Sequence, residues 1–373
     1  MSANTIQLRS MARFASRLSR SRPMLAKSAP PRVLGSLATT FAVGAAILLS
    51  ATGTGLAQKK PQLIKLAAFT PPREQITKHI LPEFARRVTR DSGGTIRVEV
   101  YPGGVLGKDP RAQYKLVLNG VLDMALIVPS NTPGRFLDDE IVALPLLVRS
   151  SSEGAELLWR LYAKGKIGGY EKVEVLSFVS TAPYSVHTRF PVKSLKDLAG
   201  KRVRSGTRLH GLTVQALGAS PVAMSALFVA ENLAKGVIDG TLFGWESMRA
   251  FRVIDAAYHH VEGVPLGGLT VAVIMNKRLY KSLSTPARAA INKHRGLWFS
   301  TAQGKLIDGV AVKMLAAIKA DKKHTVVKPT GKDLAAWQRA TAPVLEKWKK
   351  ERPGNPALLE AAVKELKAMR SGK

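Results

Sequence analysis

Two short runs of side chains in this 373-residue chain could take part in acid–base or metal chemistry, a histidine pair and an acidic triplet. His259 and His260 are adjacent, so their side chains point apart in a helix or a strand, and no third ligand stands near them in the sequence. We expect this pair to pack at the surface or between domains. We expect the run Asp138–Glu140 to be a solvated loop, because three consecutive carboxylates converge on one cation only in a looped geometry.

The sequence patterns of known catalytic centres are missing. The chain has no cysteine, which excludes disulfides, thiolate metal sites and cysteine nucleophiles. It also has no G-x-S-x-G, H-E-x-x-H or G-x-x-x-x-G-K-[ST] pattern. No acid–base pair follows from residue spacing, so the sequence predicts neither an enzyme nor a metal or cofactor site.

The composition is strongly basic, with a formal net charge of +31. A charge of this size is typical of proteins that bind nucleic acids. The basic residues are scattered, however, and many fall on predicted outer helix faces, as in Lys319–Lys323. Zinc-finger, RNA-recognition and basic-zipper patterns are also missing. We therefore expect no nucleic-acid partner and interpret the charge as a non-specific attraction to anionic surfaces or anionic solutes.

Residues 1–57 have the order of a secretory signal peptide. Residues 1–34 carry basic side chains and no acidic one, the apolar stretch is densest at Phe41–Ala51, and Gly55-Leu56-Ala57 supplies small residues for cleavage. The apolar core is shorter than the roughly 20 residues of a membrane span, which argues against the alternative of an uncleaved anchor. We predict cleavage after Ala57, which removes seven positive charges from +31 and leaves +24.

Apolar periodicity predicts an α/β fold. Strand-like and helix-like runs alternate along the first part of the chain, and this alternation is the signature of a parallel sheet. The strand-like runs are 62–70, 95–100 and 121–128, and the helix-like runs are 74–90 and 111–119.

A second series of strands and helices begins near Tyr184, and the chain is long enough for two domains. We therefore predict two lobes. Lobe I comprises 58–182 and about 269–310, and lobe II comprises 183–268 and about 311–373.

One short internal repeat supports the two-lobe layout. Gly120–Asp123 (GVLD) and Gly236–Asp239 (GVID) are near copies, and each follows a short helix and opens an apolar strand. The two strands end in residues that can form hydrogen bonds or stack, Ser130-Asn131 and Trp245-Glu246. Because ligands sit outside the carboxyl ends of strands in open α/β sheets, two such ends that face each other predict a cleft.

Five motifs, in this order and spacing, resemble those of the solute-binding (DctP-like) periplasmic subunits of TRAP transporters, the tripartite ATP-independent periplasmic transporters. The resemblance extends over roughly residues 62–340. The motifs are Gly94–Gly107 (GTIRVEVYPGGVLG), Asn119–Leu126 (NGVLDMAL), Asp197–Thr207 (DLAGKRVRSGT), Leu217–Met224 (LGASPVAM) with Gly236–Gly240 (GVIDG), and Val273–Leu283 (VIMNKRLYKSL).

The resemblance implies a two-lobed periplasmic-binding-protein fold of type II, with a hinge and an interlobe cleft that closes on a ligand. It implies a periplasmic protein without catalysis and without a cofactor, and we expect a monomer. The implied partners are a small organic acid and the small and large integral subunits of the transporter, with transport driven by an ion gradient.

In this family an arginine in a D-L-x-G-x-x-[IV]-R pattern grips the ligand carboxylate, and Arg204 occupies that position. A guanidinium suits this task because it is planar, permanently charged, and offers two parallel donors to a carboxylate. The alternative is an ordinary surface arginine or an internally paired one, with Lys201 and Arg202 as basic neighbours that are easily confused with it.

The chain departs from the family pattern in two places. Many members have a second arginine about 20 residues before the first, near the position of Tyr184, and many have an asparagine near the position of Phe243. Both are missing here. The resemblance therefore implies a more aromatic cleft, walled by Phe243 and Trp245. Such walls suit a ligand with an apolar or aromatic body better than a sialic acid with its many hydroxyls.

Arg135, which follows the first-lobe strand, is a candidate to replace the missing arginine. The alternative is a structural arginine that fixes its own loop. Further candidate ligand contacts are Asn131, Tyr184 and His187.

The sequence thus predicts the periplasmic subunit of a TRAP transporter, which captures a small organic carboxylate and delivers it to the membrane permease. Two alternatives stay open. The charge of the mature chain favours a periplasmic sensory or polyanion-binding module. An enzyme on the same fold would need a nucleophile or a metal set that we do not find.

Overall fold

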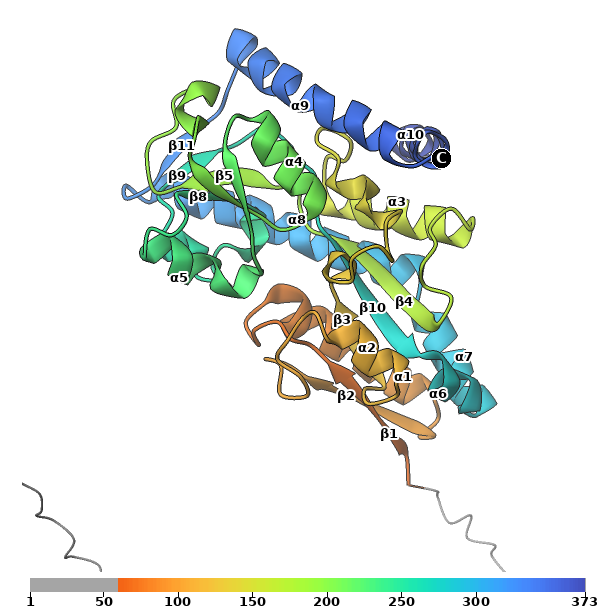
Figure 1. Cartoon of the computed structure of the whole chain (residues 1–373). Helices are drawn as coiled ribbons and strands as arrows, with labels where there is room; N and C mark the ends of the chain where they lie inside the picture. Colours follow the sequence, from red (N-terminus) through yellow and green to blue (C-terminus); the bar gives the residue numbers. More distant parts are fainter. Residues whose placement is uncertain (1–59, 373) are drawn as a thin grey trace, which may run out of the picture. The chain divides into compact units, whose positions relative to one another are not determined.

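The computed structural model describes residues 60–372, so the predicted signal peptide at 1–57 lies outside the described residues. The described residues belong to one compact unit. Their strands form two separate sheets, and helices pack against both, as Figure 1 shows. No helix within 60–372 combines the length and the apolar character that a membrane crossing requires.

The first sheet has five strands in the order β2-β1-β3-β10-β4. Strands β1, β2 and β3 run parallel, whereas β10 runs antiparallel to both of its neighbours. Every residue of β3 and β10 is buried, as expected where helices cover both faces of a sheet. The strands are β1 (Gln62–Ala67), β2 (Ile96–Tyr101), β3 (Met124–Ile127), β4 (Val173–Ser180) and β10 (Thr270–Asn276).

The second sheet has six strands in the order β11-β9-β5-β8-β6-β7. Strands β6, β7 and β8 run parallel, whereas β5 runs antiparallel to its neighbours β8 and β9. The strands are β5 (Ser185–Thr188), β6 (Arg202–Ser205), β7 (Ser220–Ala223), β8 (Gly240–Phe243), β9 (His259–Val261) and β11 (Thr325–Val327).

Each sheet contains one antiparallel strand that follows a crossing from the other sheet. Strand β5 follows β4, and β10 follows β9, through connections at 181–184 and 262–269. The two connections are hydrogen-bonded to each other, because the Tyr184 amide donates to the Gly267 carbonyl at 2.8 Å and the Thr181 amide donates to the Leu269 carbonyl at 3.0 Å. These paired connections form a hinge between two α/β lobes, which confirms the predicted fold class.

The repeated GV[LI]D sequences have the same role in the two sheets. Both begin with a glycine of positive φ. The Asp123 carboxylate accepts a hydrogen bond from the Lys65 amide of β1 at 2.8 Å, and the Asp239 carboxylate accepts one from the Arg202 amide of β6 at 2.9 Å. Each aspartate therefore ties the strand that follows it to the parallel neighbour of that strand.

One helical segment changes from a π-helix to an α-helix next to a proline. The π-helix η1 (Ile76–Ile80) leads into α1 (Leu81–Asp91), which has Pro82 in its first turn, where the missing N–H is not needed. The other α-helices are α2 (Gln113–Leu118), α3 (Ser151–Ala163), α4 (Arg208–Ala216), α5 (Val229–Ala234), α6 (Lys277–Ser282), α7 (Thr285–His294), α8 (Leu297–Ala320), α9 (Gly331–Glu351) and α10 (Asn355–Arg370). The 3-10 helices are η2 (Pro129–Asn131), η3 (Asp139–Ala143), η4 (Leu195–Leu198), η5 (Ala226–Phe228), η6 (Trp245–Ser247) and η7 (Val253–Asp255).

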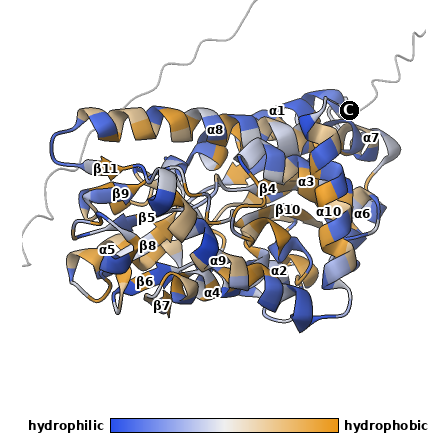
Figure 2. Cartoon of the chain, turned by 90° about the horizontal axis from the view of Figure 1, so that it is seen from above, coloured by the Kyte–Doolittle hydropathy of each residue, from blue (hydrophilic) through white to orange (hydrophobic). Residues whose placement is uncertain are grey.

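The long helix α8 packs against both lobes. Phe299 and Ile307 join the core of the first lobe, and Met314 and Ile318 join the core of the second. Figure 2 shows α8 running past α3 and β4 along one part of its length and past β11 at its far end. The helix therefore connects the two lobes in addition to the hinge.

The last two helices pack differently from the predicted lobe assignment. Helix α9 contributes Trp337 to the core of the second lobe and Trp348 to the core of the first. Helix α10 packs against α3, and its Leu358 and Leu366 join the first-lobe core. The assignment of 311–373 to lobe II is therefore wrong for α10. An apolar helix face predicts burial, but it does not identify the partner.

The acidic run Asp138–Glu140 is not the solvated loop that the sequence suggested. Asp139 and Glu140 are buried. Asp139 accepts a hydrogen bond from the Tyr170 hydroxyl, and Glu140 forms an ion pair with Arg208 Nη2 at 2.8 Å. Burial raises the pKa of Asp139 well above its ordinary value. The partners come from distant segments, which the spacing of the run does not reveal.

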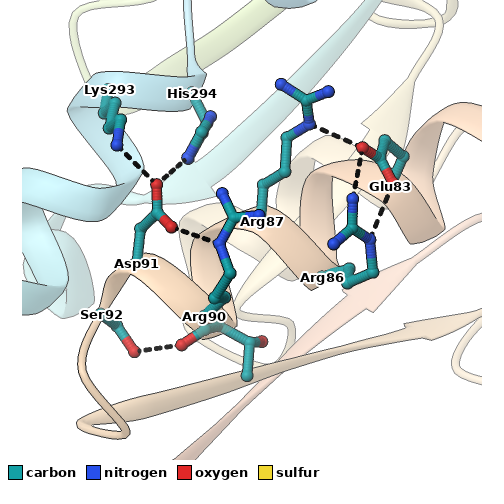
Figure 3. A network of polar contacts seen from close by, with 9 residues as sticks. Glu83, Arg86, Arg87, Arg90, Asp91, Ser92, Lys293 and His294 are labelled. Carbon is teal, nitrogen blue, oxygen red and sulfur yellow. Dashed lines mark hydrogen bonds and ion pairs between the residues drawn. The ribbon is translucent and has the colours of Figure 1, made fainter.

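A polar network joins α1 to α7 in the first lobe, as Figure 3 shows. The Asp91 carboxylate contacts Lys293 Nζ and His294 Nε2, both at 2.8 Å. Its contacts with Arg90, Lys293 and His294 hold the pKa of Asp91 well below its ordinary value. The network braces two helices and contains none of the predicted site residues.

We predict that Gly304→Ala destabilises the protein, although alanine favours helices. An added Cβ would lie 2.4 Å from the Ser152 Cα of α3, and a backbone atom cannot rotate away. The expected loss in the free energy of unfolding is about 1–3 kcal/mol. The matched control is Gly309→Ala on the same helix, where nothing lies within 4 Å and a gain of up to about 1 kcal/mol is expected. Urea unfolding followed by circular dichroism measures both, and equal effects would contradict the close approach of α3 and α8.

Candidate functional site

Arg204 lies in β6 and is only 2% exposed. Its Nε donates to the Met224 carbonyl at 3.0 Å, and its Nη1 donates to the Leu242 carbonyl at 3.1 Å. Burial lowers the pKa of Arg204, yet a guanidinium keeps its charge in proteins. No carboxylate within residues 60–372 forms an ion pair with it. A buried charge without a counter-charge is costly. The Arg204 guanidinium is therefore the central feature of the candidate site.

Two aromatic rings lie beside the guanidinium. The Phe243 ring centroid is 5.5 Å from its central carbon, within cation–π range. The Tyr184 ring is stacked on Phe243 with a centroid separation of 6.1 Å and an interplanar angle of 19°. Burial raises the pKa of Tyr184, and the nearby charge of Arg204 acts in the opposite direction. The structure thus brings together three candidates that the sequence analysis named separately.

Gly206 leaves space next to the guanidinium. A Cβ at this position would lie 3.0 Å from Arg204 Nη2 and 3.1 Å from Nη1. Helix α4 begins at Arg208, directly after its N-cap Thr207. Because the N-terminus of a helix is the positive end of its dipole, α4 adds to the positive potential of Arg204. The local electrostatics therefore favour an anion.

His210 belongs to this group, and the sequence analysis missed it. Its ring is stacked on Tyr184 with a centroid separation of 4.6 Å and an interplanar angle of 22°, and it is fully buried. Nε2 faces the Gly267 carbonyl of the hinge at 3.4 Å. Burial lowers the pKa of His210 to about 3, so the ring is neutral at pH 7. A signal existed, because His210 lies in the first helical turn after β6, at the strand end that carries Arg204.

Trp245 and His187 lie one layer behind Phe243. The Trp245 indole donates to the Ser185 hydroxyl at 2.8 Å, and its ring centroid is 4.6 Å from that of His187. His187 Nε2 donates to the Phe243 carbonyl at 3.2 Å. These two candidates therefore support the aromatic wall, and they have no hydrogen bond with Arg204.

Buried His187 and His260 and half-buried His324 form a hydrogen-bonded chain, which corrects the expectation that His260 packs at the surface or between domains. His187 Nδ1 lies 2.8 Å from His260 Nδ1, and His260 Nε2 lies 3.0 Å from His324 Nδ1. Because the Phe243 carbonyl accepts from His187 Nε2, His187 Nδ1 must accept a hydrogen bond from His260 Nδ1, and His260 Nε2 must accept one from His324 Nδ1. Every ring nitrogen between the two ends of the chain is therefore paired. Among residues 60–372 no group of histidines and acids is arranged to hold a metal ion.

The first-lobe candidates Arg135 and Asn131 have no hydrogen bond or cation–π contact with this group among the described residues. The Arg135 guanidinium lies 5.1 Å from the Tyr114 ring centroid, 5.8 Å from that of Phe136, and 4.0 Å from the Glu171 carboxylate. These are the contacts of an arginine that fixes its own loop. Asn131 ends the 3-10 helix η2 and is half-buried. We leave both residues out of the proposed site.

Two cavities lie elsewhere. One, of about 390 Å³, is lined by Leu147, Leu366 and Arg370, among others, and one of about 190 Å³ is lined by residues that include Glu140 and Arg208. Neither is lined by a predicted site residue.

Two α/β lobes on a hydrogen-bonded hinge, with a buried guanidinium that has no acidic partner in 60–372, define a solute-binding protein. The family model described as "Bacterial extracellular solute-binding protein, family 7" matches residues 66–351, and the chain belongs to this family.

Individual relatives agree with this membership. The C4-dicarboxylate-binding periplasmic protein DctP of Rhodobacter capsulatus is 27% identical over 323 residues, which cover 84% of this chain and 92% of that protein. A TRAP solute-binding protein from Rhodoferax ferrireducens T118, solved with copurified benzoate, is 27% identical with a TM-score of 0.77 and covers 83% of this chain and 98% of its own.

A marine metagenome TRAP solute-binding protein specific for aromatic acid ligands is 30% identical with a TM-score of 0.76, and covers 82% of this chain and 98% of its own. The resemblance to TRAP solute-binding proteins that the sequence motifs predicted is thereby confirmed.

We predict that His260→Gln makes the protein less sensitive to acid. Burial lowers the pKa of His260 to about 2, so this histidine takes up its proton on unfolding between about pH 6.5 and pH 2, and stability is lost as the pH falls. At pH 5 this penalty is about 2 kcal/mol. The stability of the variant relative to the wild type should therefore rise by about that amount between pH 7 and pH 5.

Urea unfolding at both pH values measures this change. Groups whose pKa is raised on folding, such as Glu246 with a pKa of about 8, act in the opposite direction, but they are present in both proteins and cancel in the difference. His79→Gln, at an exposed position, is the matched control. A change no larger than that of the control would show that His260 does not carry the penalty.

Proposed function

We propose that this chain is the periplasmic receptor of a TRAP transporter for an aromatic monocarboxylate, held by Arg204. The observation that carries the proposal is the burial of this guanidinium without an acidic partner in 60–372. Two of its donors are taken by carbonyls, and among the described residues no hydrogen bond is found at Nη2, which lies next to Gly206. A ligand carboxylate supplies the missing negative charge and accepts from the remaining donors.

The rings beside Arg204 support an aromatic ligand body. Tyr184, His210 and Phe243 present stacked faces around the guanidinium, and Trp245 supports them from behind. Such a wall binds a planar apolar group through contact area and stacking. Relatives solved with benzoate and with 3-hydroxybenzoate bind ligands of this class.

The protein acts by binding and release, without chemical turnover. Residues 1–57 direct export and are removed, and the mature monomer binds its ligand in the periplasm. The closed form then delivers the ligand to the small and large membrane subunits of the transporter. No nucleic acid takes part, and the positive charge of the chain attracts the anionic ligand over a distance.

We predict that Arg204→Ala weakens benzoate binding at least about a hundredfold, because the loss of one partner of a buried ion pair costs about 3–5 kcal/mol. Isothermal titration calorimetry measures the affinity. The protein should first be unfolded in guanidinium chloride and refolded, so that copurified ligand is removed. Mass spectrometry of the released material identifies the natural ligand.

Arg202→Ala is the matched control. Arg202 lies two residues away in the same strand, but its side chain is 49% exposed and pairs with Asp239. Its removal should leave the affinity for benzoate within about threefold, and circular dichroism should show both variants folded. If benzoate binds Arg204→Ala and the wild type equally well, Arg204 is not the carboxylate anchor. If neither benzoate nor phenylacetate binds the wild type, the aromatic class is wrong.

A further inference from the structure

His210 has a buried nitrogen without a partner. The ring is fully buried, and Nδ1 has no hydrogen-bond partner among the described residues. The other nitrogen, Nε2, faces the Gly267 carbonyl, which can only accept a hydrogen bond. Nε2 must therefore carry the proton, and Nδ1 of the neutral ring is an acceptor. A buried acceptor without a donor is costly, so its retention calls for an explanation.

The place of this nitrogen connects it with the proposed ligand. The His210 ring is stacked on Tyr184 with a centroid separation of 4.6 Å, and the charge of Arg204 acts on both rings. Helix α4 carries His210 in its first turn, directly after the strand of Arg204. The proposed anchor for the carboxylate and the unpaired acceptor thus both lie near Tyr184.

The chemistry of the missing donor can be narrowed down. A carboxylate only accepts hydrogen bonds, so it cannot satisfy a second acceptor. An ammonium group could donate, but it would stand close to the permanent positive charge of Arg204, which already disfavours a proton on His210. A neutral donor remains, and on a small organic acid the common one is a hydroxyl group.

We propose that the ligand is a hydroxy-substituted aromatic acid whose hydroxyl donates to His210 Nδ1 while its carboxylate binds Arg204. This proposal rests on the proposed function, because it assumes that Arg204 holds the carboxylate. It makes His210 the residue that distinguishes a hydroxylated acid from the acid without the hydroxyl.

Two pairs of ligands test the proposal, because the members of each pair differ by one hydroxyl. They are mandelate with phenylacetate, and 3-hydroxybenzoate with benzoate, each titrated calorimetrically into ligand-free protein. The wild type should prefer the hydroxy acid of at least one pair by about ten- to hundredfold, the cost of an unpaired buried acceptor. Phenylglycine, which carries an ammonium group, should bind more weakly than mandelate.

Two substitutions separate the two ring nitrogens. In His210→Gln the side-chain amide can still donate to the Gly267 carbonyl, but no acceptor remains at the position of Nδ1. In His210→Asn an oxygen can take the position of Nδ1, but the bond to Gly267 is lost. The preference ratio should fall toward one in His210→Gln and be largely kept in His210→Asn. His79→Gln, at an exposed position, should keep the wild-type ratio.

The outcomes are distinct. A wild type that binds all four acids through Arg204 without a preference in either pair overturns this proposal and leaves the proposed function intact, since a water molecule would then satisfy Nδ1. A preference that survives in His210→Gln overturns it as well. Failure of all four acids to bind the wild type contradicts the proposed function itself. Because the ratio is taken within each protein, a general loss of affinity in a variant does not affect it.

Discussion

A permanent charge, buried and without a counter-charge in the described chain, is the constraint on which the site depends. Main-chain carbonyls from both sides hold the Arg204 guanidinium, Leu242 in β8 and Met224 after β7. Such dipoles offset only part of the cost of removing a charge from water. The order β7-β6-β8 in the second sheet places these carbonyls on either side of Arg204. The sheet topology therefore orients the charge, and the remaining cost is available for a ligand anion to relieve.

The hinge and the site share residues, which links ligand binding to the orientation of the lobes. Tyr184 ends one hinge connection and contacts Arg204, while Gly267 lies in the other and faces His210. Gly267 is also tightly enclosed on its first-lobe side, because a Cβ there would lie 2.2 Å from the Ala143 carbonyl oxygen. A rotation of the lobes cannot leave these contacts unchanged. A ligand that contacts Arg204 and His210 would therefore favour one lobe orientation over others.

The sequence predicted those features that depend on local spacing and missed those that depend on distant contacts. Strand periodicity, the repeated aspartates and the position of Arg204 are all encoded within a few residues, and the structure agrees with the predicted two-lobed fold. The histidine chain joins residues that are 73 and 64 positions apart, so a search for neighbouring ligands cannot find it. The burial of Asp139 depends on Tyr170, and the partner of α10 depends on which helix faces remain uncovered. The histidine chain, the burial of Asp139 and the packing of α10 are therefore set by tertiary contacts and cannot be predicted from local spacing.

The buried histidines show how a fully paired polar group differs from one that we propose to contact a ligand. In the chain of His187, His260 and His324, every inner nitrogen has a partner, so the chain needs nothing from outside. His210 is as deeply buried but only half paired, and the Glu246 carboxyl, whose charge acts on Tyr184, also has an oxygen without a partner. An unpaired buried polar group is costly, and one that lies beside the proposed anchor is a candidate for contact with a ligand. Because the His210 ring is stacked on Tyr184 beside Arg204, a donor to Nδ1 is the group that the proposed ligand would have to supply.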